Sequence, residues 1–393
     1  MYSKGSSSYR YVILASAVLL QACFGATYSW AVFVEPLKQI FQKGQAAAQL
    51  PFSIFYIFFP FTMIFSGYIL DRIGIRKAVI AGIGIFGLGW ILSGLFGRNI
   101  MMISLGIGLI GGIGVGIGYV IPIKVCVQWF PRNKGLATGM AVAGFGGGAA
   151  ILSHLARYLM EARGLSPLQV YKIFGGIYIS AGILCGLALK SPEGGESPQN
   201  SRMEIKSILK DKTFRLLYAG MFAGLFGGFA IIANLKQIYA HATPLMGATA
   251  VSFFAIFNAL GRIIWGGIFD RTKGKIAIIA NLLFQALALL TQSLFMKSAV
   301  SLYVFAGFAG FNYGGVLVLY ASEVGHVWGA EKLPKIYGMI FSANILASLS
   351  PVFAGFMYDM SSGNFNLVFL LISIFITAIS VLIYLTYQAR PTY

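Results

Sequence analysis

The sequence predicts an all-α polytopic membrane protein in which twelve transmembrane helices form two pseudo-symmetric six-helix bundles. Three observations support this prediction: an apolar composition, apolar runs of membrane-crossing length, and a repeat at fixed spacing. Of the 393 residues, 58% are hydrophobic and only 10% are charged, whereas a soluble domain is about half apolar and about one quarter charged. The composition therefore argues against a soluble protein.

Apolar runs of suitable length follow one another along the whole chain. A helix needs about 20 residues to cross the ~30 Å hydrocarbon core of a bilayer. The first run is too long, and too lightly charged ahead of it, to be a cleaved signal peptide. The expected spans are 11–34, 51–70, 78–95, 102–127, 136–159, 170–189, 216–235, 251–269, 276–295, 300–320, 334–357 and 367–387.

The least apolar stretch divides the chain in the middle. It contains SPEGGESPQNSR, a mixture of Pro, Gly, Ser and charge that is typical of a linker, followed by IKSILK, which predicts a short surface helix. We expect an N-terminal bundle over 1–190, a cytoplasmic linker over 191–213 and a C-terminal bundle over 214–393.

The two halves carry a related motif. GYILDRIG begins at Gly67 and GGIFDRTKG at Gly266, and each places Gly four residues before an Asp-Arg pair. Asp270 follows Asp71 by 199 residues, and the Gly-Met pairs at Gly139 and Gly338 have the same separation. A repeated six-helix unit predicts a substrate site between the halves, near the bilayer midplane.

The net charge of +18 is explained by topology. If the N-terminus is cytoplasmic, Lys and Arg concentrate in the inner segments and both tails, while the outer loops are much poorer in them. This positive-inside bias predicts that both termini lie in the cytoplasm and that the basic residues contact anionic membrane lipid. Nucleic acid is not an expected partner.

Motifs for a cofactor, a metal or catalysis are weak. GIGIFG at 82–87 and GIGLIG at 106–111 match GxGxxG but lie within apolar spans, where closely spaced glycines let helices approach each other. The three cysteines lie singly, the three histidines are far apart, and no span contains paired carboxylates. We therefore expect no cofactor, no metal and no enzymatic activity.

Two segments carry a resemblance to known transporters. GYILDRIGIRK resembles the loop between the second and third helices of the major facilitator superfamily. WFPRNKGLATGMAVAGFGGG, residues 129–148, is similar to the segment entering the fifth helix in the monocarboxylate transporter and oxalate/formate antiporter families. The resemblance implies a bacterial homologue in the inner membrane, with the motif carboxylates and cations controlling gating: Asp71, Arg72, Asp270 and Arg271.

Arg262 is the charge that most needs an explanation. It lies eight residues before Asp270, which at ~1.5 Å per residue is roughly 12 Å from the helix end and close to the middle of the membrane. A charge at that depth costs about 2.5 to 3.5 kcal/mol on insertion scales. Arg262 could bond backbone carbonyls and fix helix packing, or bind a substrate carboxylate. In both related families an arginine at this position binds the substrate carboxylate.

Four further residues are candidates for the same site. Asn258 lies one turn before Arg262 and could orient its guanidinium or reach the substrate. Tyr119 and Tyr313 lie within spans and either face substrate or close a helix contact. Phe341 could form the apolar wall against a short alkyl group, with ordinary core packing as the alternative.

The resemblance also guides the choice of substrate. In the oxalate/formate antiporter a lysine of the eleventh helix supplies a second positive charge for the dianionic substrate, and Asn344 stands at that position here. A dicarboxylate would bring an unpaired charge into a low dielectric, so we expect a monocarboxylate. Lys124 lies five residues before Trp129 and is expected to extend toward the cytoplasm, outside the site.

These observations predict a secondary active transporter of small monocarboxylates such as L-lactate or pyruvate, working as a monomer by alternating access with proton symport. The proton carrier stays open, because Asn258 replaces the aspartate of animal monocarboxylate transporters and the span 11–34 contains no lysine. The substrate carboxylate, a tyrosine network or Glu323 could serve. The alternatives are an anion exchanger of the oxalate/formate type and a carboxylate sensor that does not transport.

Overall fold

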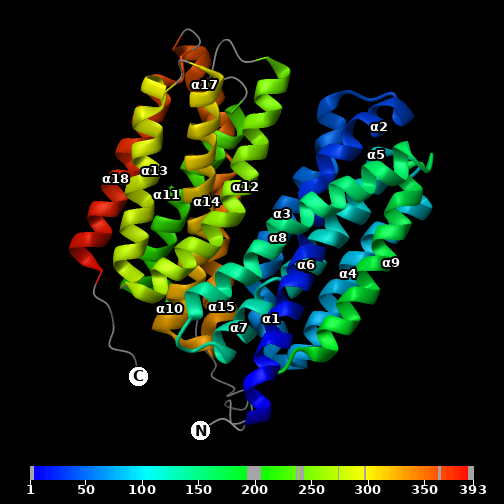
Figure 1. The fold of residues 1–393 in the computed structure, drawn as a ribbon, viewed down its shortest axis with the longest axis horizontal. Helices are drawn as coiled ribbons and strands as arrows, with labels where there is room; N and C mark the ends of the chain where they lie inside the picture. Colours follow the sequence, from blue (N-terminus) through cyan, green and yellow to red (C-terminus); the bar gives the residue numbers. More distant parts are fainter. Residues whose placement is uncertain are drawn as a thin grey trace. The chain divides into compact units, whose positions relative to one another are not determined.

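The computed structural model describes residues 4–192, 205–235, 238, 243–272, 274–295, 298–361 and 364–387. The chain within these ranges is helical and has no strand, as predicted (Figure 1). The first half contains α1 (Lys4–Phe24), the 3-10 segment η1 (Gly25–Trp30), α2 (Ala31–Phe41), α3 (Gln45–Ile73), α4 (Ile75–Phe96), α5 (Ile100–Ile103), the π-helical segment η2 (Ser104–Ile110), α6 (Gly111–Gly118), α7 (Val120–Trp129), α8 (Lys134–Glu161) and α9 (Pro167–Ala188). The second half contains α10 (Ile205–Lys210), α11 (Lys212–Asn234), α12 (Pro244–Arg271), α13 (Gly274–Phe295), α14 (Ala299–Val327), α15 (Gly329–Phe341), α16 (Ala343–Ala347), α17 (Ser350–Met360) and α18 (Asn366–Thr386).

Several helices begin at a side chain that binds free backbone N–H groups. Ser166 accepts from the backbone N–H of Gln169 at the start of α9, and the side chain of Gln169 accepts from the backbone N–H of Ser166. Asp211 accepts from the first turn of α11, and Thr243 accepts from the backbone N–H of Met246 in α12. Such caps satisfy donors that have no partner within the helix and so define where each helix starts.

Eleven helical stretches of the described residues are long and apolar enough to cross a membrane. The span expected over 334–357 is instead built from three consecutive helices, α15, α16 and α17. The second interruption precedes Pro351, which has no N–H to donate to the carbonyl of Ala347 and therefore breaks the helical ladder. Sequence hydropathy located this span, but the breaks depend on its backbone hydrogen bonds.

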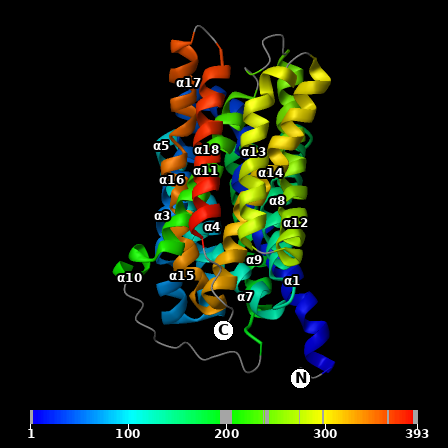
Figure 2. The ribbon, with the colours of Figure 1, turned by 90° about the vertical axis from the view of Figure 1, so that its left-hand side faces the viewer.

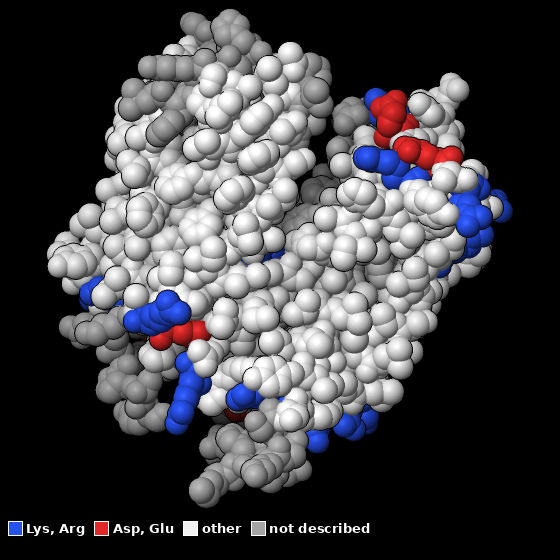
Figure 3. Space-filling model, viewed as in Figure 1, with Lys and Arg blue, Asp and Glu red and all other residues white. Residues whose placement is uncertain are grey.

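The outer faces of the helices are apolar. Ile151 and Leu184 are each 71% exposed and Leu385 is 72% exposed. In water, exposing such side chains is unfavourable, because each CH₂ group that is buried gains ~0.8 kcal/mol. On the face drawn in Figure 3, acidic and basic side chains gather toward the helix ends, and the surface between them is almost entirely uncharged. This distribution suits an integral membrane protein, whose flanks contact lipid.

The chain forms two compact units. Unit 1 comprises Met1–Pro131, Met140–Asn200 and Ala330–Met339, and unit 2 comprises Arg132–Gly139, Ser201–Gly329 and Ile340–Tyr393. The change from one unit to the other at residues 200–201 falls in the expected linker, of which 193–204 lie outside the described residues. The helix predicted at IKSILK is confirmed as α10.

Each unit includes a short segment from the other half of the sequence, and the contacts of these segments repeat. A Cβ atom on Gly139 would meet the carbonyl oxygen of Arg262 at 2.2 Å, and a Cβ atom on Gly338 would meet the carbonyl oxygen of Met63 at 2.2 Å. Gly338 and Arg262 follow Gly139 and Met63, respectively, by 199 residues. The internal repeat predicted from spacing is therefore present in the packing as well.

Different helix pairs form the core of each unit. In unit 1, α4 packs against α9, and the ring of Trp90 lies 5.4 Å from the ring centroid of Tyr171 and 5.5 Å from that of Tyr178. In unit 2, α14 packs against α12, and α18 packs against α13 and α11 (Figure 2). These contacts hold the membrane-crossing helices at the positions from which the candidate residues project.

Candidate functional site

Arg262 is buried in α12 and held by its own helix. Only 2% of the residue is exposed, and its Nε donates a 2.9 Å hydrogen bond to Oδ1 of Asn258, which is also buried. The i to i+4 spacing places the two side chains on one face of the helix. The structure therefore brings Asn258 and Arg262 together, and the hydrogen bond fixes the plane of the guanidinium group.

Glycines place the backbone of α12 directly against α14. A Cβ atom on Gly314 would meet the carbonyl oxygen of Asn258 at 2.2 Å, and one on Gly310 would meet that of Phe254 at 2.3 Å. From the other side, a Cβ atom on Gly261 would meet the carbonyl oxygen of Phe311 at 2.1 Å. Small residues permit this approach between membrane helices. The rotation and depth of α12, and hence the position of Arg262, are set by these contacts.

Tyr313 and Phe341 are buried within unit 2. The ring of Tyr313 lies 5.9 Å from that of Phe229 and 5.7 Å from that of Phe254, and a Cβ atom on Gly228 would meet its ring at 2.1 Å. Phe341 ends α15 and is 4% exposed. Tyr313 thus makes the helix contacts that were one of its two expected roles.

Tyr119 lies in unit 1, at the boundary between α6 and α7. It is 2% exposed, and its ring lies 5.2 Å from that of Phe59 and 5.5 Å from that of Phe145. Nε2 of Gln21 donates a 2.9 Å hydrogen bond to its backbone carbonyl. Tyr119 is therefore part of an aromatic cluster that joins α3 and α8 to the boundary between α6 and α7.

Asn344 lies in α16, and its side chain is uncharged. Its Nδ2 donates a 2.9 Å hydrogen bond to the backbone carbonyl of Phe341, and 8% of the residue is exposed. The amide is used to satisfy the chain at the break between α15 and α16, where a carbonyl lacks its helical partner.

Asp71 forms an ion pair with Lys335 of α15, and both residues belong to unit 1. The Lys335 ammonium also lies 5.1 Å from the ring centroid of Tyr68. One turn before Asp71, a Cβ atom on Gly67 would meet the backbone nitrogen of Lys335 at 2.6 Å. The Gly-x-x-x-Asp spacing thus puts a close backbone contact and a carboxylate on the same face of α3.

Asp270 holds the beginning of α8 in the corresponding way within unit 2. Its two carboxylate oxygens accept 2.7 Å hydrogen bonds from the backbone N–H groups of Gly135 and Leu136. One turn earlier, a Cβ atom on Gly266 would meet the carbonyl oxygen of Gly135 at 2.2 Å. The first N–H groups of a helix lack helical partners and carry partial positive charge, so they suit a carboxylate.

The arginines beside these carboxylates have a different placement. Arg72 and Arg271 are exposed, and neither forms an ion pair with another residue in the described ranges. The positive partners of the motif carboxylates are Lys335 and the start of α8. Sequence reasoning missed both, because neither lies near its carboxylate along the chain.

Lys124 is buried and paired with a carboxylate. It is 5% exposed and forms an ion pair with Glu331 at the start of α15, and Gln128 donates to the same carboxylate. The burial and the pairing were not predicted, whereas the expectation that Lys124 extends toward the cytoplasm stays a prediction. A carboxylate supplied by a distant helix offsets part of the cost of burying the ammonium.

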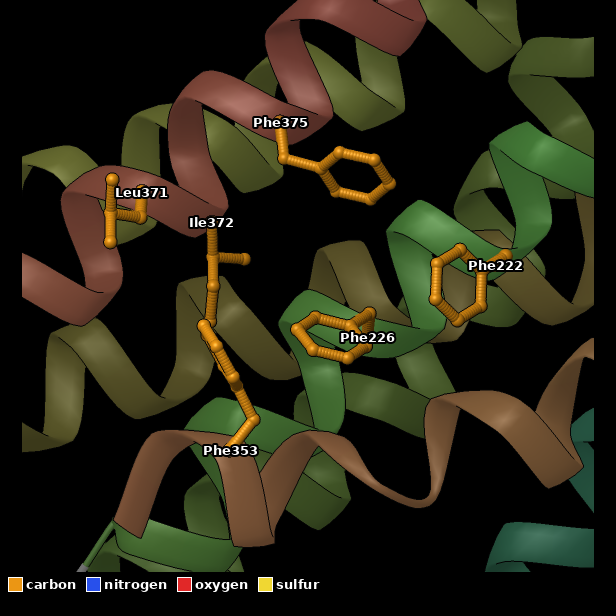
Figure 4. A pocket seen from close by; sticks show the side chains of 6 residues that line it. All are labelled: Phe222, Phe226, Phe353, Leu371, Ile372 and Phe375. Atoms are coloured by element: carbon orange, nitrogen blue, oxygen red, sulfur yellow. The ribbon is translucent and has the colours of Figure 1, made fainter. Parts of the chain in front are cut away.

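Within the described residues, no group of three or more His, Cys, Asp or Glu side chains could hold a metal ion. A cavity of about 280 Å³ lies in unit 2 between α11, α17 and α18. Figure 4 shows its lining residues, which are all apolar: Phe222, Phe226, Phe353, Leu371, Ile372 and Phe375. Because this lining has no donor for an anion, the cavity does not suit a carboxylate.

Comparison with known proteins identifies related transporters. Residues 15–348 match the model of the Major Facilitator Superfamily. The chain is 26% identical over 386 residues to the oxalate:formate antiporter of Oxalobacter formigenes, covering 95% of this chain and 90% of that protein. It is also 26% identical over 381 residues to monocarboxylate transporter 3 of Rattus norvegicus, covering 90% and 76%. The solved transporter FucP, in the outward conformation, matches the fold with a TM-score of 0.73 at 17% identity, over 97% of this chain and 100% of that chain.

Proposed function

The chain belongs to the Major Facilitator Superfamily and is a membrane transporter rather than an enzyme, and on this premise we propose that it carries small monocarboxylates such as L-lactate and pyruvate by alternating access, coupled to protons. The observation that carries the proposal is Arg262, a buried guanidinium in a membrane helix whose plane is fixed by Asn258. Ionisable residues at membrane depth usually mark a substrate or ion pathway.

Arginine suits a carboxylate for geometric reasons. Its planar group can place two N–H donors against the two oxygens of a carboxylate, and such charge-assisted bonds are about twice as strong as neutral ones. The bond from Nε to Asn258 and the glycine contacts of α12 with α14 orient the group in advance. A preoriented cation loses less entropy when it binds its ligand.

The proposal favours one carboxylate over two. Asn344 is neutral and bonds to the chain, so it supplies no second charge for a dianion, and burying an uncompensated charge costs several kcal/mol. The names of two relatives, monocarboxylate transporter 3 and apicoplast pyruvate carrier 1 of Toxoplasma gondii, agree with a monocarboxylate. The likeness to an oxalate:formate antiporter over 95% of this chain makes anion exchange the second candidate.

The remaining features of the proposal concern topology and gating. We place the bundles at 1–190 and 214–393 and the linker at 191–213. The protein is placed in a bacterial inner membrane with both termini on the cytoplasmic side, and a monomer is the proposed functional form. Asp71 and Asp270, with the neighbouring Arg72 and Arg271, are assigned to gating. Their support is the paired geometry of the carboxylates, because breaking the bonds to Lys335 and to the start of α8 would release those segments.

One experiment separates the candidates. The purified protein is reconstituted into liposomes, and uptake of labelled L-lactate is followed with an inward proton gradient, with unlabelled lactate inside, or with neither. Accumulation driven by the gradient is the expected result for a symporter. Uptake only with internal lactate would indicate an exchanger, and binding without flux would indicate a sensor.

A further inference from the structure

Glu323 is a buried acidic residue that the carboxylate site does not use. It lies one turn before the end of α14 and is 2% exposed. Its Oε1 accepts a hydrogen bond from the hydroxyl of Tyr387, which follows α18. Its Oε2 is buried and has no hydrogen-bond partner in the described part of the chain. One carboxyl oxygen is thus satisfied and the other is not.

The beginning of α13 closes over the unpartnered oxygen. A Cβ atom on Gly274, the first residue of α13, would meet Oε2 at 1.8 Å, so no larger residue fits there unless the carboxyl group moves. The neighbouring Lys275 directs its ammonium elsewhere. Its Nζ donates a 2.8 Å hydrogen bond to the backbone carbonyl of Tyr387 and lies 5.4 Å from the ring centroid of Tyr384.

The other ionisable groups on elements packed against this end of α14 also have separate contacts. Asp270 of α12 accepts from the start of α8, and Nζ of Lys134 lies 3.5 Å from the carbonyl oxygen of Gly325. His326, on α14 itself, has its ring 6.3 Å from that of Phe269. On the α11 side, a Cβ atom on Gly220 would meet the Tyr320 hydroxyl at 2.5 Å. None of the described cations forms an ion pair with Glu323.

A carboxylate in these surroundings would be a buried charge without a counter-ion, which costs several kcal/mol. The neutral acid avoids that cost, and the Tyr387 hydroxyl can still donate its hydrogen bond to Oε1 of the protonated carboxyl group. If the helix ends that enclose Glu323 separate, water can hydrate the carboxylate and stabilise the charged form. The group therefore binds a proton when enclosed and releases it when hydrated.

We propose that Glu323 is the proton-binding group of the transport cycle, with Tyr387 as its positioning residue; this rests on the proton symport proposed above. In the releasing step the O–H bond of the Glu323 acid breaks, the electron pair stays on the carboxylate oxygen, and the proton passes to water. Net transport then moves one proton with one monocarboxylate anion, and the cycle carries no net charge.

α14 provides a physical connection between this group and the carboxylate site. The same helix carries Gly314, which touches the backbone of α12 at Asn258, and Glu323, nine residues later. At ~1.5 Å per residue the two positions are about 14 Å apart along one continuous helix. A shift of α14 relative to α12 and α13 would therefore change the surroundings of Arg262 and of Glu323 together.

The test uses Glu323→Gln, which keeps the shape of the side chain and cannot release a proton. In liposomes, gradient-driven accumulation of labelled lactate is expected to fall at least ~10-fold, while exchange with internal unlabelled lactate stays within about two-fold, because exchange needs no deprotonation. Glu35→Gln is the matched control, since the Glu35 side chain is 64% exposed and pairs with Lys38 on α2. That control is expected to behave as wild type in both modes.

A second measurement does not depend on transport. Lactate is added to weakly buffered, detergent-purified protein, and the pH change is recorded. Wild type is expected to exchange protons with the solution when lactate shifts the protein between the enclosed and the hydrated form of Glu323. Glu323→Gln is expected to exchange none, and Tyr387→Phe to show a shifted pH dependence of this exchange; equal proton exchange in wild type and Glu323→Gln would overturn the role of Glu323.

The outcomes separate the two proposals. Accumulation at the wild-type level by Glu323→Gln would overturn the role of Glu323 and leave monocarboxylate symport standing. If Glu323→Gln instead loses both accumulation and exchange, Glu323 has a structural role, and its role in proton binding is overturned as well. A wild-type protein that moves no lactate in any mode would instead overturn the proposed function and, with it, this role.

Discussion

Replacing Arg262 with lysine keeps the positive charge and removes the planar group. Lysine has no counterpart of Nε, so the 2.9 Å bond to Asn258 is lost, and a single ammonium cannot place two donors in one plane against a carboxylate. Losing one charge-assisted hydrogen bond to the ligand costs about 1.5 to 3 kcal/mol. Since about 1.4 kcal/mol corresponds to a tenfold change, the Kd for L-lactate is expected to rise by roughly 10- to 150-fold.

The assay is equilibrium binding of labelled lactate to detergent-purified protein, with thermal unfolding of the same preparations as a measure of folding. Arg157→Lys is the matched control, because Arg157 is 60% exposed and its only described ion pair, with Glu161, is a surface contact at 3.8 Å. Its Kd is expected to stay within about two-fold of wild type. If folded Arg262→Lys binds lactate as tightly as wild type, or loses thermal stability alone, Arg262 fixes helix packing and does not bind the carboxylate.

Three other predictions concern packing and ion pairs. Gly314→Ala places a Cβ atom 2.2 Å from the carbonyl oxygen of Asn258, whereas Gly267→Ala meets nothing within 4 Å. Tm should fall only in the first variant, by an amount corresponding to about 1 to 3 kcal/mol. Equal Tm values in the two variants would contradict the close approach of α12 and α14. Asp270→Asn turns an amide NH₂ toward one of two backbone donors, so the N–H groups at the start of α8 should exchange with deuterium faster, and unchanged exchange would argue against this contact. Lys124→Met removes one partner of the ion pair with Glu331, whose carboxylate is 38% exposed. It should lower the free energy of unfolding by less than the ~3 to 5 kcal/mol of a fully buried pair. Adding Glu331→Gln should recover part of that loss, and additive effects of the two substitutions on thermal unfolding would contradict the pairing.

Local patterns predicted much of the fold and part of the site. The membrane spans follow from apolar runs of helix length, and eleven of them are continuous helical stretches in the described chain. The alignment of Asn258 with Arg262 follows from their i to i+4 spacing, which already places both side chains on one helix face. The 199-residue repeat likewise anticipated the matching contacts of Gly139 and Gly338.

Contacts between distant segments were not predictable in the same way. Lys124 looked like a lysine near the membrane surface until α15 supplied Glu331. The Asp-Arg motif suggested that its own arginines serve as the cations, yet Arg72 is exposed while Lys335 pairs with Asp71. Each partner lies in another part of the sequence, and no local spacing rule connects the two.

By itself, the sequence determined that this chain lies in a membrane, that its two halves are related, and that one arginine stands at membrane depth beside an asparagine. These properties depend on hydropathy, length and helical periodicity, which are local. Only the tertiary structure decided that Asp270 binds the start of α8, that Gly314 admits the backbone of α12, and that Glu323 is enclosed by Gly274 and Tyr387. Those contacts arise from helix packing, which joins residues that no short stretch of sequence contains.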